Sequence, residues 1–347
     1  MTTFVIAEAG VNHNGSLDLA RALVDAAADA GANAIKFQTF TAEKVVQKTA
    51  AKAQYQREST GSGTQFDMLK KLELSDDMHD DLIAYCAKRG IEFMSTPFDL
   101  EAADFLASRG LARLKVPSGE LTNHRFLAHL ASKGLPLILS TGMGNLAEVE
   151  EAIEAVRAGR IAAGHRDLPE NYLTVLHCTS NYPAKLEDVN LRAMRTMADK
   201  TGLPIGYSDH TLGIAVCAAA VALGATVIEK HFTLDRTMEG PDHKASLEPS
   251  ELTAMIAQIR AIEKALGSAV KAPTASELEM LKLARRSVVA AKALKTGDII
   301  AADALDTLRP AGGIEPKHFN SLIGRIVARD VPEGAALQWD DIAQGSI

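Results

Sequence analysis

Short apolar runs alternate with amphipathic segments from residue 4 to about residue 266. Eight of these runs have the length and the alternation of buried strands, and they lie at residues 4–10, 34–40, 91–98, 113–119, 136–142, 173–180, 204–210 and 226–232. Apolar residues recur at helical spacing between them, as in the stretch from a capping Ser16 to a terminating Gly31. This order predicts an α/β fold in which a parallel sheet closes into a (β/α)8 TIM barrel.

The connection after the second predicted strand is unusually long. Residues 41–64 are polar and contain Gly and Ser. A long loop on the catalytic side of a barrel often covers the substrate, and the alternative is a solvated excursion.

The pattern changes after the last helical segment. Residues 271–284 resemble a linker, and residues 285–347 consist of short segments punctuated by Gly and Pro. Residues 291–305 and 328–342 form a weak repeat that aligns Gly297 with Gly334 and Ile300 with Leu337. We therefore expect a barrel domain over 1–270, a linker over 271–284 and a small domain over 285–347. A domain this small commonly needs a partner surface, although it could also pack on its own barrel.

Composition and charge narrow the classes of function. The chain has 347 residues, of which 47% are hydrophobic and 23% charged, as in an ordinary globular protein. A net charge of −7 argues against a nucleic-acid partner. Three widely spaced cysteines, no signal-peptide pattern and an apolar stretch at 214–225 too short to span a bilayer predict a cytoplasmic protein without a membrane partner.

Two histidines end neighbouring predicted strands, His210 in GYSDHT and His231 in IEKHF. Because side chains alternate along a strand, His210 shares a face with Ser208, and His231 shares a face with Glu229. A lone histidine is usually an ordinary core or surface residue. Two imidazoles from adjacent strands at a barrel mouth instead supply half of a divalent metal site, which substrate oxygen and water could complete.

Further polar residues close the other predicted strands. They are Glu8, Lys36, Gln38, Thr96, Lys115, Ser118, Glu120, Ser140, His177 and Thr179. Two lysines beside short hydroxyl side chains suit a ligand that carries both phosphate and carboxylate, such as phosphoenolpyruvate. Glu8 and Glu120 are candidates for acid/base chemistry or for binding a substrate hydroxyl, and the sequence does not separate their roles.

Ordered motifs along the whole chain resemble the bacterial sialic acid synthase family. They are IAEAGVNHNG, IKFQTF, STPFDL, KVPSGE, LSTGM, LHCTSNYP, GYSDHTLG and EKHFTLDRTMEGPDHKASLEP. The segments SVVAAKALKTGDII and LRPAGGI resemble the antifreeze-like SAF domain, a β-clip fold that these synthases carry after the barrel. The resemblance implies condensation of phosphoenolpyruvate with an open-chain N-acylated hexosamine, usually N-acetylmannosamine. The products would be a nine-carbon 2-keto sugar acid and phosphate, and the cofactor Mn²⁺, with Mg²⁺ or Co²⁺ as alternatives.

The same resemblance implies a role for each matched residue. Glu120 would be the base for water, with Glu8 and Lys115 as further catalytic residues. The implied phosphate ligands are Lys115, Ser118, Ser140 and Ser208, with Thr179 and Ser180 beside them, and Ser180 departs from some relatives. The implied carboxylate ligands are Lys36 and Thr96, the sugar contacts Glu8, Gln38, Tyr182 and Asp242, and the metal ligands His210 and His231. Arg309 would enter the active site of the other subunit, which implies a domain-swapped homodimer.

Three interpretations remain open on sequence alone. The leading one is an N-acetylneuraminate or N,N'-diacetyllegionaminate synthase of cell-surface carbohydrate biosynthesis. A pseudaminate or phospho-sugar acid synthase would use the same chemistry on another sugar. A non-catalytic protein that binds carbohydrate or ice would belong to a different class, and it would not need two strand-end histidines beside lysines and carboxylates.

Overall fold

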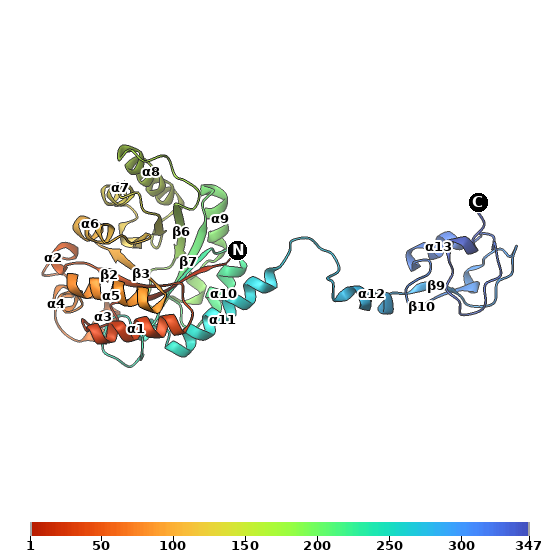
Figure 1. The fold of residues 1–347 in the computed structure, drawn as a ribbon, viewed down its shortest axis with the longest axis horizontal. Helices are drawn as coiled ribbons and strands as arrows, with labels where there is room; N and C mark the ends of the chain where they lie inside the picture. The colour runs from red at the N-terminus through yellow and green to blue at the C-terminus, as the bar shows by residue number, and fades with distance from the viewer. Residues whose placement is uncertain (1, 346–347) are drawn as a thin grey trace. The chain divides into compact units, whose positions relative to one another are not determined.

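A computed structural model describes residues 2–345 of the chain (Figure 1). The chain divides into two compact units between Gly267 and Ser268. Among the described residues, no helix combines the length and the apolar character that a membrane crossing requires.

The first unit is the predicted parallel eight-stranded barrel surrounded by helices. Its strands are β1 (Phe4–Gly10), β2 (Ala34–Thr39), β3 (Glu92–Pro97), β4 (Leu114–Val116), β5 (Leu137–Ser140), β6 (Leu173–Cys178), β7 (Ile205–Asp209) and β8 (Val227–His231). They pair in the order β3-β2-β1-β8-β7-β6-β5-β4, and β3 contacts β4 across the remaining seam. Each of the eight predicted strands contains one of these.

Helices follow the strands and cover the outside of the barrel (Figure 1). They are α1 (Leu17–Asp29), α5 (Asp76–Arg89), α6 (Leu100–Ser108), α7 (His124–Ser132), α8 (Leu146–Ala162), α9 (Arg192–Thr201), α10 (Ala215–Ala222) and α11 (Pro249–Leu266). Ser16 caps α1 as predicted, since its hydroxyl accepts from the backbone N–H of Leu19 at 3.4 Å. Gly31, with a φ of +82°, follows the end of the same helix.

The interior of the barrel is built in layers, because inward side chains recur at every second residue of a strand. The lowest layer is an apolar floor formed by Phe4, Ile6, Ala34, Met94, Ile138, Leu176 and Val227. Gly206 completes this floor, since a Cβ there would lie 2.5 Å from Leu176 and 2.5 Å from the carbonyl of Val227. Two residues further along the strands, the inward positions become polar, as at Glu8, Lys36 and Glu229.

The long connection after β2 is folded. It contains α2 (Ala42–Val45), α3 (Gln54–Thr60) and α4 (Gln65–Lys70). Thr64 caps α4 reciprocally with Asp67, at 3.1 Å and 3.2 Å. The Lys52 ammonium donates to the carbonyls of Thr60, Gly61 and Ser62 at 3.1–3.3 Å. Residues predicted as a loop are therefore partly helical, because local caps organise them.

The second unit has a core of its own. It contains α12 (Glu277–Ala284), β9 (Ser287–Ala290), β10 (Leu305–Leu308) and α13 (Phe319–Leu322), and β9 pairs with β10 antiparallel. The predicted repeat has a structural counterpart: Gly297 and Gly334 adopt φ values of +89° and +80°. Ile300 and Leu337 are both buried in this core. Helix α12 lies inside the segment predicted as a linker, and more than half of the Met280 and Leu283 side chains is exposed.

Candidate active site

A cavity of about 570 Å³ opens among the carboxyl ends of the barrel strands. It is lined by these predicted site residues: Glu8, Lys36, Gln38, Thr96, Lys115, Ser118, Ser140, Ser180, Tyr182, Ser208, His210, His231 and Asp242. Strand ends that are far apart in the sequence meet here because the sheet closes, as predicted for a TIM barrel.

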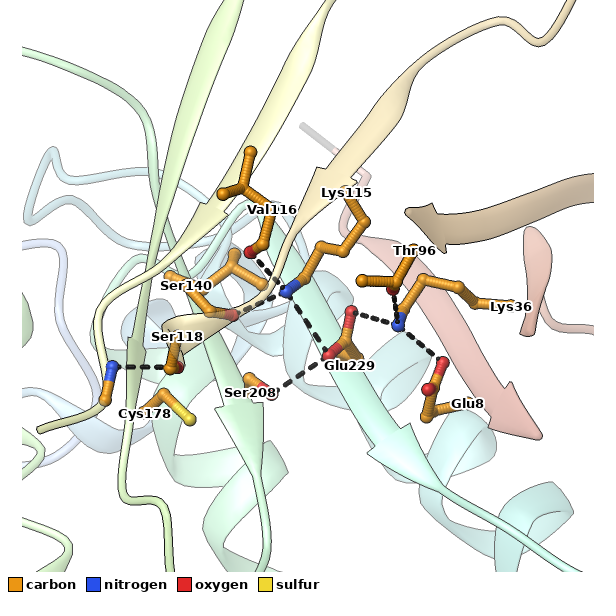
Figure 2. Close-up of polar contacts among 12 residues, drawn as sticks. Glu8, Lys36, Thr96, Lys115, Val116, Ser118, Ser140, Cys178, Ser208 and Glu229 are labelled. Atoms are coloured by element: carbon orange, nitrogen blue, oxygen red, sulfur yellow. Dashed lines mark hydrogen bonds and ion pairs between the residues drawn. The ribbon is translucent and has the colours of Figure 1, made fainter. Parts of the chain in front are cut away.

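Two lysines and two carboxylates alternate across the bottom of the cavity, and we call these four side chains the charged quartet (Figure 2). The Lys36 ammonium lies 2.7 Å from a carboxylate oxygen of Glu8 and 3.7 Å from Glu229. The Lys115 ammonium lies 3.8 Å from the other oxygen of Glu229. All four side chains are buried. Since buried charges must be paired, the quartet holds both ammonium groups at fixed positions inside the barrel.

The pKa values of the two carboxyl groups are set by two opposing effects: burial raises them, and the nearby ammonium groups lower them. Burial raises the pKa of Glu8 to about 7, although Lys36 opposes the shift. Burial acts on Glu229 in the same direction, but Lys115 and Lys36 outweigh it and lower the pKa of that carboxyl. Glu8 can therefore take up or release a proton near neutrality, while Glu229 stays ionised.

Hydroxyl groups surround Lys115 on the side away from Glu8. The Lys115 ammonium donates to the Ser140 hydroxyl at 2.7 Å. The Ser118 hydroxyl accepts from the backbone N–H of Gly142 at 3.0 Å. A Cβ at Gly142 would lie 2.1 Å from the Ser180 hydroxyl and 2.9 Å from that of Ser118, so only glycine lets these hydroxyls converge. One ammonium, several hydroxyls and a backbone turn make an arrangement that suits a phosphate group, which we call the phosphate cradle.

The Lys36 side of the cavity suits a carboxylate and a sugar. The Lys36 ammonium donates to the Thr96 hydroxyl at 2.8 Å. Side chains of Glu8, Gln38 and Asp242 gather around Gly10, where an added Cβ would lie 3.4–3.6 Å from each of them. Carboxylate and amide groups clustered in this way can bind several hydroxyls of one ligand.

The two predicted metal ligands lie side by side, with ring centroids 5.4 Å apart. The His210 Nδ1 hydrogen bonds to the carbonyl of Thr179 at 2.7 Å, which fixes that nitrogen as the donor and leaves Nε2 with its lone pair. The His231 Nδ1 is buried without a hydrogen-bond partner, 4.0 Å from a carboxylate oxygen of Asp242. Burial lowers the pKa of His231 well below its usual value. Burial lowers the pKa of His210 as well, but Cys178 and the Thr179 carbonyl outweigh it and raise that pKa above its usual value. In their neutral forms, the two imidazoles each offer a free nitrogen that suits a divalent cation.

Two imidazoles do not complete a metal site. Among residues 2–345, no set of three His, Cys, Asp or Glu side chains is placed to hold an ion. The arrangement fits a cation whose other positions are taken by substrate oxygen and water, as in sites that keep open positions for chemistry.

Two predicted site residues of the barrel, Glu120 and Thr179, do not line the cavity, and a third predicted site residue, Arg309, belongs to the second unit. Glu120 belongs to a 3₁₀ turn (Ser118–Glu120) after β4, accepts from the Asn123 amide at 2.6 Å, and does not line the cavity as described. Thr179 acts through its carbonyl on His210, while its hydroxyl donates to the carbonyl of Asp188 at 3.3 Å. Arg309 is an exposed residue of the second unit.

Sequence reasoning did not assign several residues that line the cavity. Glu229 is the most important, and its signal was its shared face with His231. Cys178 ends β6, and the others lie in connections after the strands; they are Val11, Gln56, Gln65, Met68, Leu69, Phe98, Pro117, Gly119, Met143 and Pro241. The α3 and α4 residues among them show that part of the folded excursion after β2 covers the mouth, the first of the two predicted possibilities.

Comparisons with known proteins match this architecture. The NeuB family model matches residues 23–271, and the SAF domain model matches residues 285–343. The chain is 50% identical over 343 residues to N,N'-diacetyllegionaminic acid synthase of Legionella pneumophila, covering 99% of this chain and 95% of that protein. It is 47% identical over 332 residues to the Campylobacter jejuni enzyme of the same name, covering 95% and 97%.

A solved structure gives the same assignment. The N-acetylneuraminic acid synthetase of Leptospira borgpetersenii superposes with a TM-score of 0.69 at 36% identity, covering 81% of this chain and 90% of that chain. The barrel and the second unit thus each match a family model. The chain belongs to the NeuB family and carries a SAF domain after its barrel.

Proposed function

We propose that this chain is a nonulosonate synthase that condenses phosphoenolpyruvate with an N-acylated amino sugar, and that its product is N,N'-diacetyllegionaminate. The full-length identity of 50% to a protein of that name carries the proposal. The relative named pseudaminic acid synthase is only 32% identical over a similar length. N-acetylneuraminate is the second candidate product, because the Leptospira structure carries that name.

The cavity supports the choice of both substrates. Lys115 and its hydroxyls face one end, and Lys36 with Thr96 faces the other, so one ligand with a phosphate and a carboxylate can engage both ammonium groups. Glu8, Gln38 and Asp242 remain to bind sugar hydroxyls. Apolar wall positions at Val11, Met68, Leu69, Phe98 and Met143 suit the methyl groups of a diacetamido, 6-deoxy sugar better than an additional hydroxyl.

The residues of the chain divide the chemistry between two ends of the cavity. The C3–C1 bond forms as phosphoenolpyruvate C3 attacks the aldehyde carbon, and the aldehyde oxygen must gain a proton. Glu8 lies among the sugar contacts and has a pKa raised to about 7, so it can donate this proton. A divalent cation held by His210 and His231 would supply Lewis acidity to the same oxygen.

Cationic character then develops at C2, the carbon that carries both anionic substituents. Glu229 lies between Lys36 and Lys115, so its ionised carboxylate faces this position and stabilises the charge. Water adds to C2 and gives one proton to the Glu229 carboxylate; the C2–O bond to phosphate then breaks, the new C2 hydroxyl gives its proton to the departing phosphate as it becomes the keto group, and phosphate leaves toward the Lys115 cradle. We assign Glu229, rather than Glu120, to assist this addition because Glu229 lines the cavity.

The decisive experiment compares acceptors. Purified protein with phosphoenolpyruvate and Mn²⁺ should release phosphate with 2,4-diacetamido-2,4,6-trideoxymannose faster than with N-acetylmannosamine, and mass spectrometry should identify each nonulosonate. Bridging ¹⁸O in phosphoenolpyruvate should appear in the phosphate, because the C2–O bond breaks. The matched control is the acceptor reduced to its alditol, which lacks the aldehyde. If neither sugar supports phosphate release, the proposal is wrong and the chain is better explained as a binding protein.

We further propose that activity requires a homodimer in which Arg309 completes the site of the partner subunit. A planar guanidinium in an exposed SAF loop suits a contact to an acyl oxygen or a hydroxyl. Inactive His210→Ala protein mixed with inactive Arg309→Ala protein should regain activity after subunit exchange, because some mixed dimers contain one intact composite site. If activity does not recover after subunit exchange is verified, Arg309 acts on the barrel of its own subunit or has no role in catalysis.

The three free cysteines, all buried, fit a reducing compartment such as the cytoplasm.

A further inference from the structure

A buried ion pair lies on the outward side of the two strands that carry the imidazoles. Asp209 and Lys230 face each other in register on β7 and β8. The Lys230 ammonium lies 2.7 Å from a carboxylate oxygen of Asp209, and their side chains are 1% and 0% exposed. Because side chains alternate, this pair lies behind the cavity and cannot touch a ligand in it.

The Asp209 carboxylate is saturated with donors. One oxygen accepts from the Tyr207 hydroxyl at 3.1 Å and from the backbone N–H of Thr211 at 3.0 Å. The other accepts from Lys230, from the Thr211 hydroxyl at 3.2 Å and from the Cys217 thiol at 3.3 Å. The carboxylate therefore connects β7 to β8, to the segment after β7 and to α10.

These contacts enclose the two histidines. Asp209 and Thr211 flank His210, and Lys230 donates to the carbonyl of Thr211 as well as to Asp209. The His210 carbonyl accepts from the Ala184 N–H at 2.8 Å, and the His231 carbonyl accepts from the Leu247 N–H at 2.9 Å. The backbone on both sides of His210, and the residue before His231, are thus held by one charged network.

Stability alone does not account for such a pair. Desolvation of two buried charges cancels most of their attraction, and apolar side chains of similar volume usually stabilise a core at least as well. A charged network with many hydrogen bonds does, however, restrict two strands to one relative position. Groups behind a metal ligand tune affinity through that placement.

We propose that the Asp209–Lys230 pair is a positioning device that holds the imidazoles of His210 and His231 at the spacing a divalent cation requires. This inference rests on the metal site of the proposed function. It predicts that breaking the network weakens metal binding by up to about tenfold, at the lower end of the range for groups that hydrogen bond a metal ligand directly, because Asp209 and Lys230 act through the backbone.

The test measures metal binding on full-length protein without substrates. Mn²⁺ affinity by calorimetry and the visible absorption of bound Co²⁺ are recorded for the double variant Asp209→Leu/Lys230→Met and for Thr211→Val. The double variant keeps an apolar contact between the strands, and Thr211→Val removes one donor in case the double variant does not fold. Both are expected to bind Mn²⁺ more weakly and to shift the Co²⁺ spectrum, with the larger effect in the double variant.

Thr39→Val is the matched control. The Thr39 hydroxyl makes buried contacts to His79 at 2.7 Å and to Ser95 at 2.6 Å, away from the two imidazoles. We expect this variant to lose melting temperature but to keep wild-type metal affinity. Wild-type affinity and spectra in folded network variants would refute the positioning role and leave the proposed function standing. Absence of metal binding in the wild type would refute the positioning role, whereas phosphate release with the two acceptor sugars decides the proposed function separately.

Discussion

Substitution of Gly142 by alanine probes the phosphate cradle most directly. Gly142 lies outside the left-handed region, so the backbone accepts alanine, but the new Cβ would lie 2.1 Å from the Ser180 hydroxyl. Ordinary contacts begin at 3.4 Å, so the hydroxyl must move by at least about 1 Å. A hydrogen bond to a charged group contributes about 1.5–3 kcal/mol, and its loss should raise KM for phosphoenolpyruvate by roughly 10- to 150-fold.

The assay is phosphate release at saturating acceptor with varied phosphoenolpyruvate. Ser180→Ala should raise KM by a similar factor without a clash. The double variant should exceed Ser180→Ala only by the effect of the new Cβ on the Ser118 hydroxyl, because both changes remove the same contribution of Ser180. The melting temperature of Gly142→Ala should stay within a few degrees of the wild type, since a serine rotamer can relieve the contact. An unchanged KM in Gly142→Ala would refute the reasoning and remove Ser180 from the cradle.

Three further predictions concern the metal, the carboxyl groups of the site and the buried His13. Chelation should abolish turnover, and added Mn²⁺ should restore it. His210→Ala should reduce kcat far more than it reduces the melting temperature; if both fall together, His210 has a structural role. Glu8→Gln and Glu229→Gln should each lower kcat by at least about a hundredfold, and Glu120→Gln by much less, whereas a large loss in Glu120→Gln with a small loss in Glu229→Gln would return the base role to Glu120. Burial lowers the pKa of His13 from 6.5 to about 4, so the unfolded state binds more protons between these values. Stability should therefore decrease by about 3 kcal/mol as the pH is lowered from 6.5 to 4, and urea unfolding of His13→Gln should show a smaller decrease over the same range.

Alternation along the strands made most of the site predictable. It placed His210 and His231 on inward faces of neighbouring strands, and it placed Glu229 on the same face as His231. The importance of Glu229 depends on its distances to Lys36 and Lys115, which come from β2 and β4. Only closure of the whole sheet brings these three residues together, and local periodicity carries no information about that closure.

Turns and excursions account for the remaining differences. The 3₁₀ turn that follows Pro117 directs Glu120 toward Asn123, although the residue lies only a few positions beyond a strand end. Gln56 and Met68 reach the cavity because caps and the Lys52 contacts fold the excursion after β2. Such placements follow from hydrogen bonds specific to each loop, for which hydrophobic spacing gives no signal.

The apolar floor of the barrel makes the active site a blind-ended well. With Ile6, Met94, Ile138 and Leu176 sealing one end, neither water nor ions can approach the charged quartet from below. Both substrates must enter, and both products must leave, through the same opening. The deeper reactant must therefore arrive before the shallower one. Since the phosphate and carboxylate cradles lie in the lower charged layer, phosphoenolpyruvate is the reactant expected to bind first, and the sugar closes the entrance behind it.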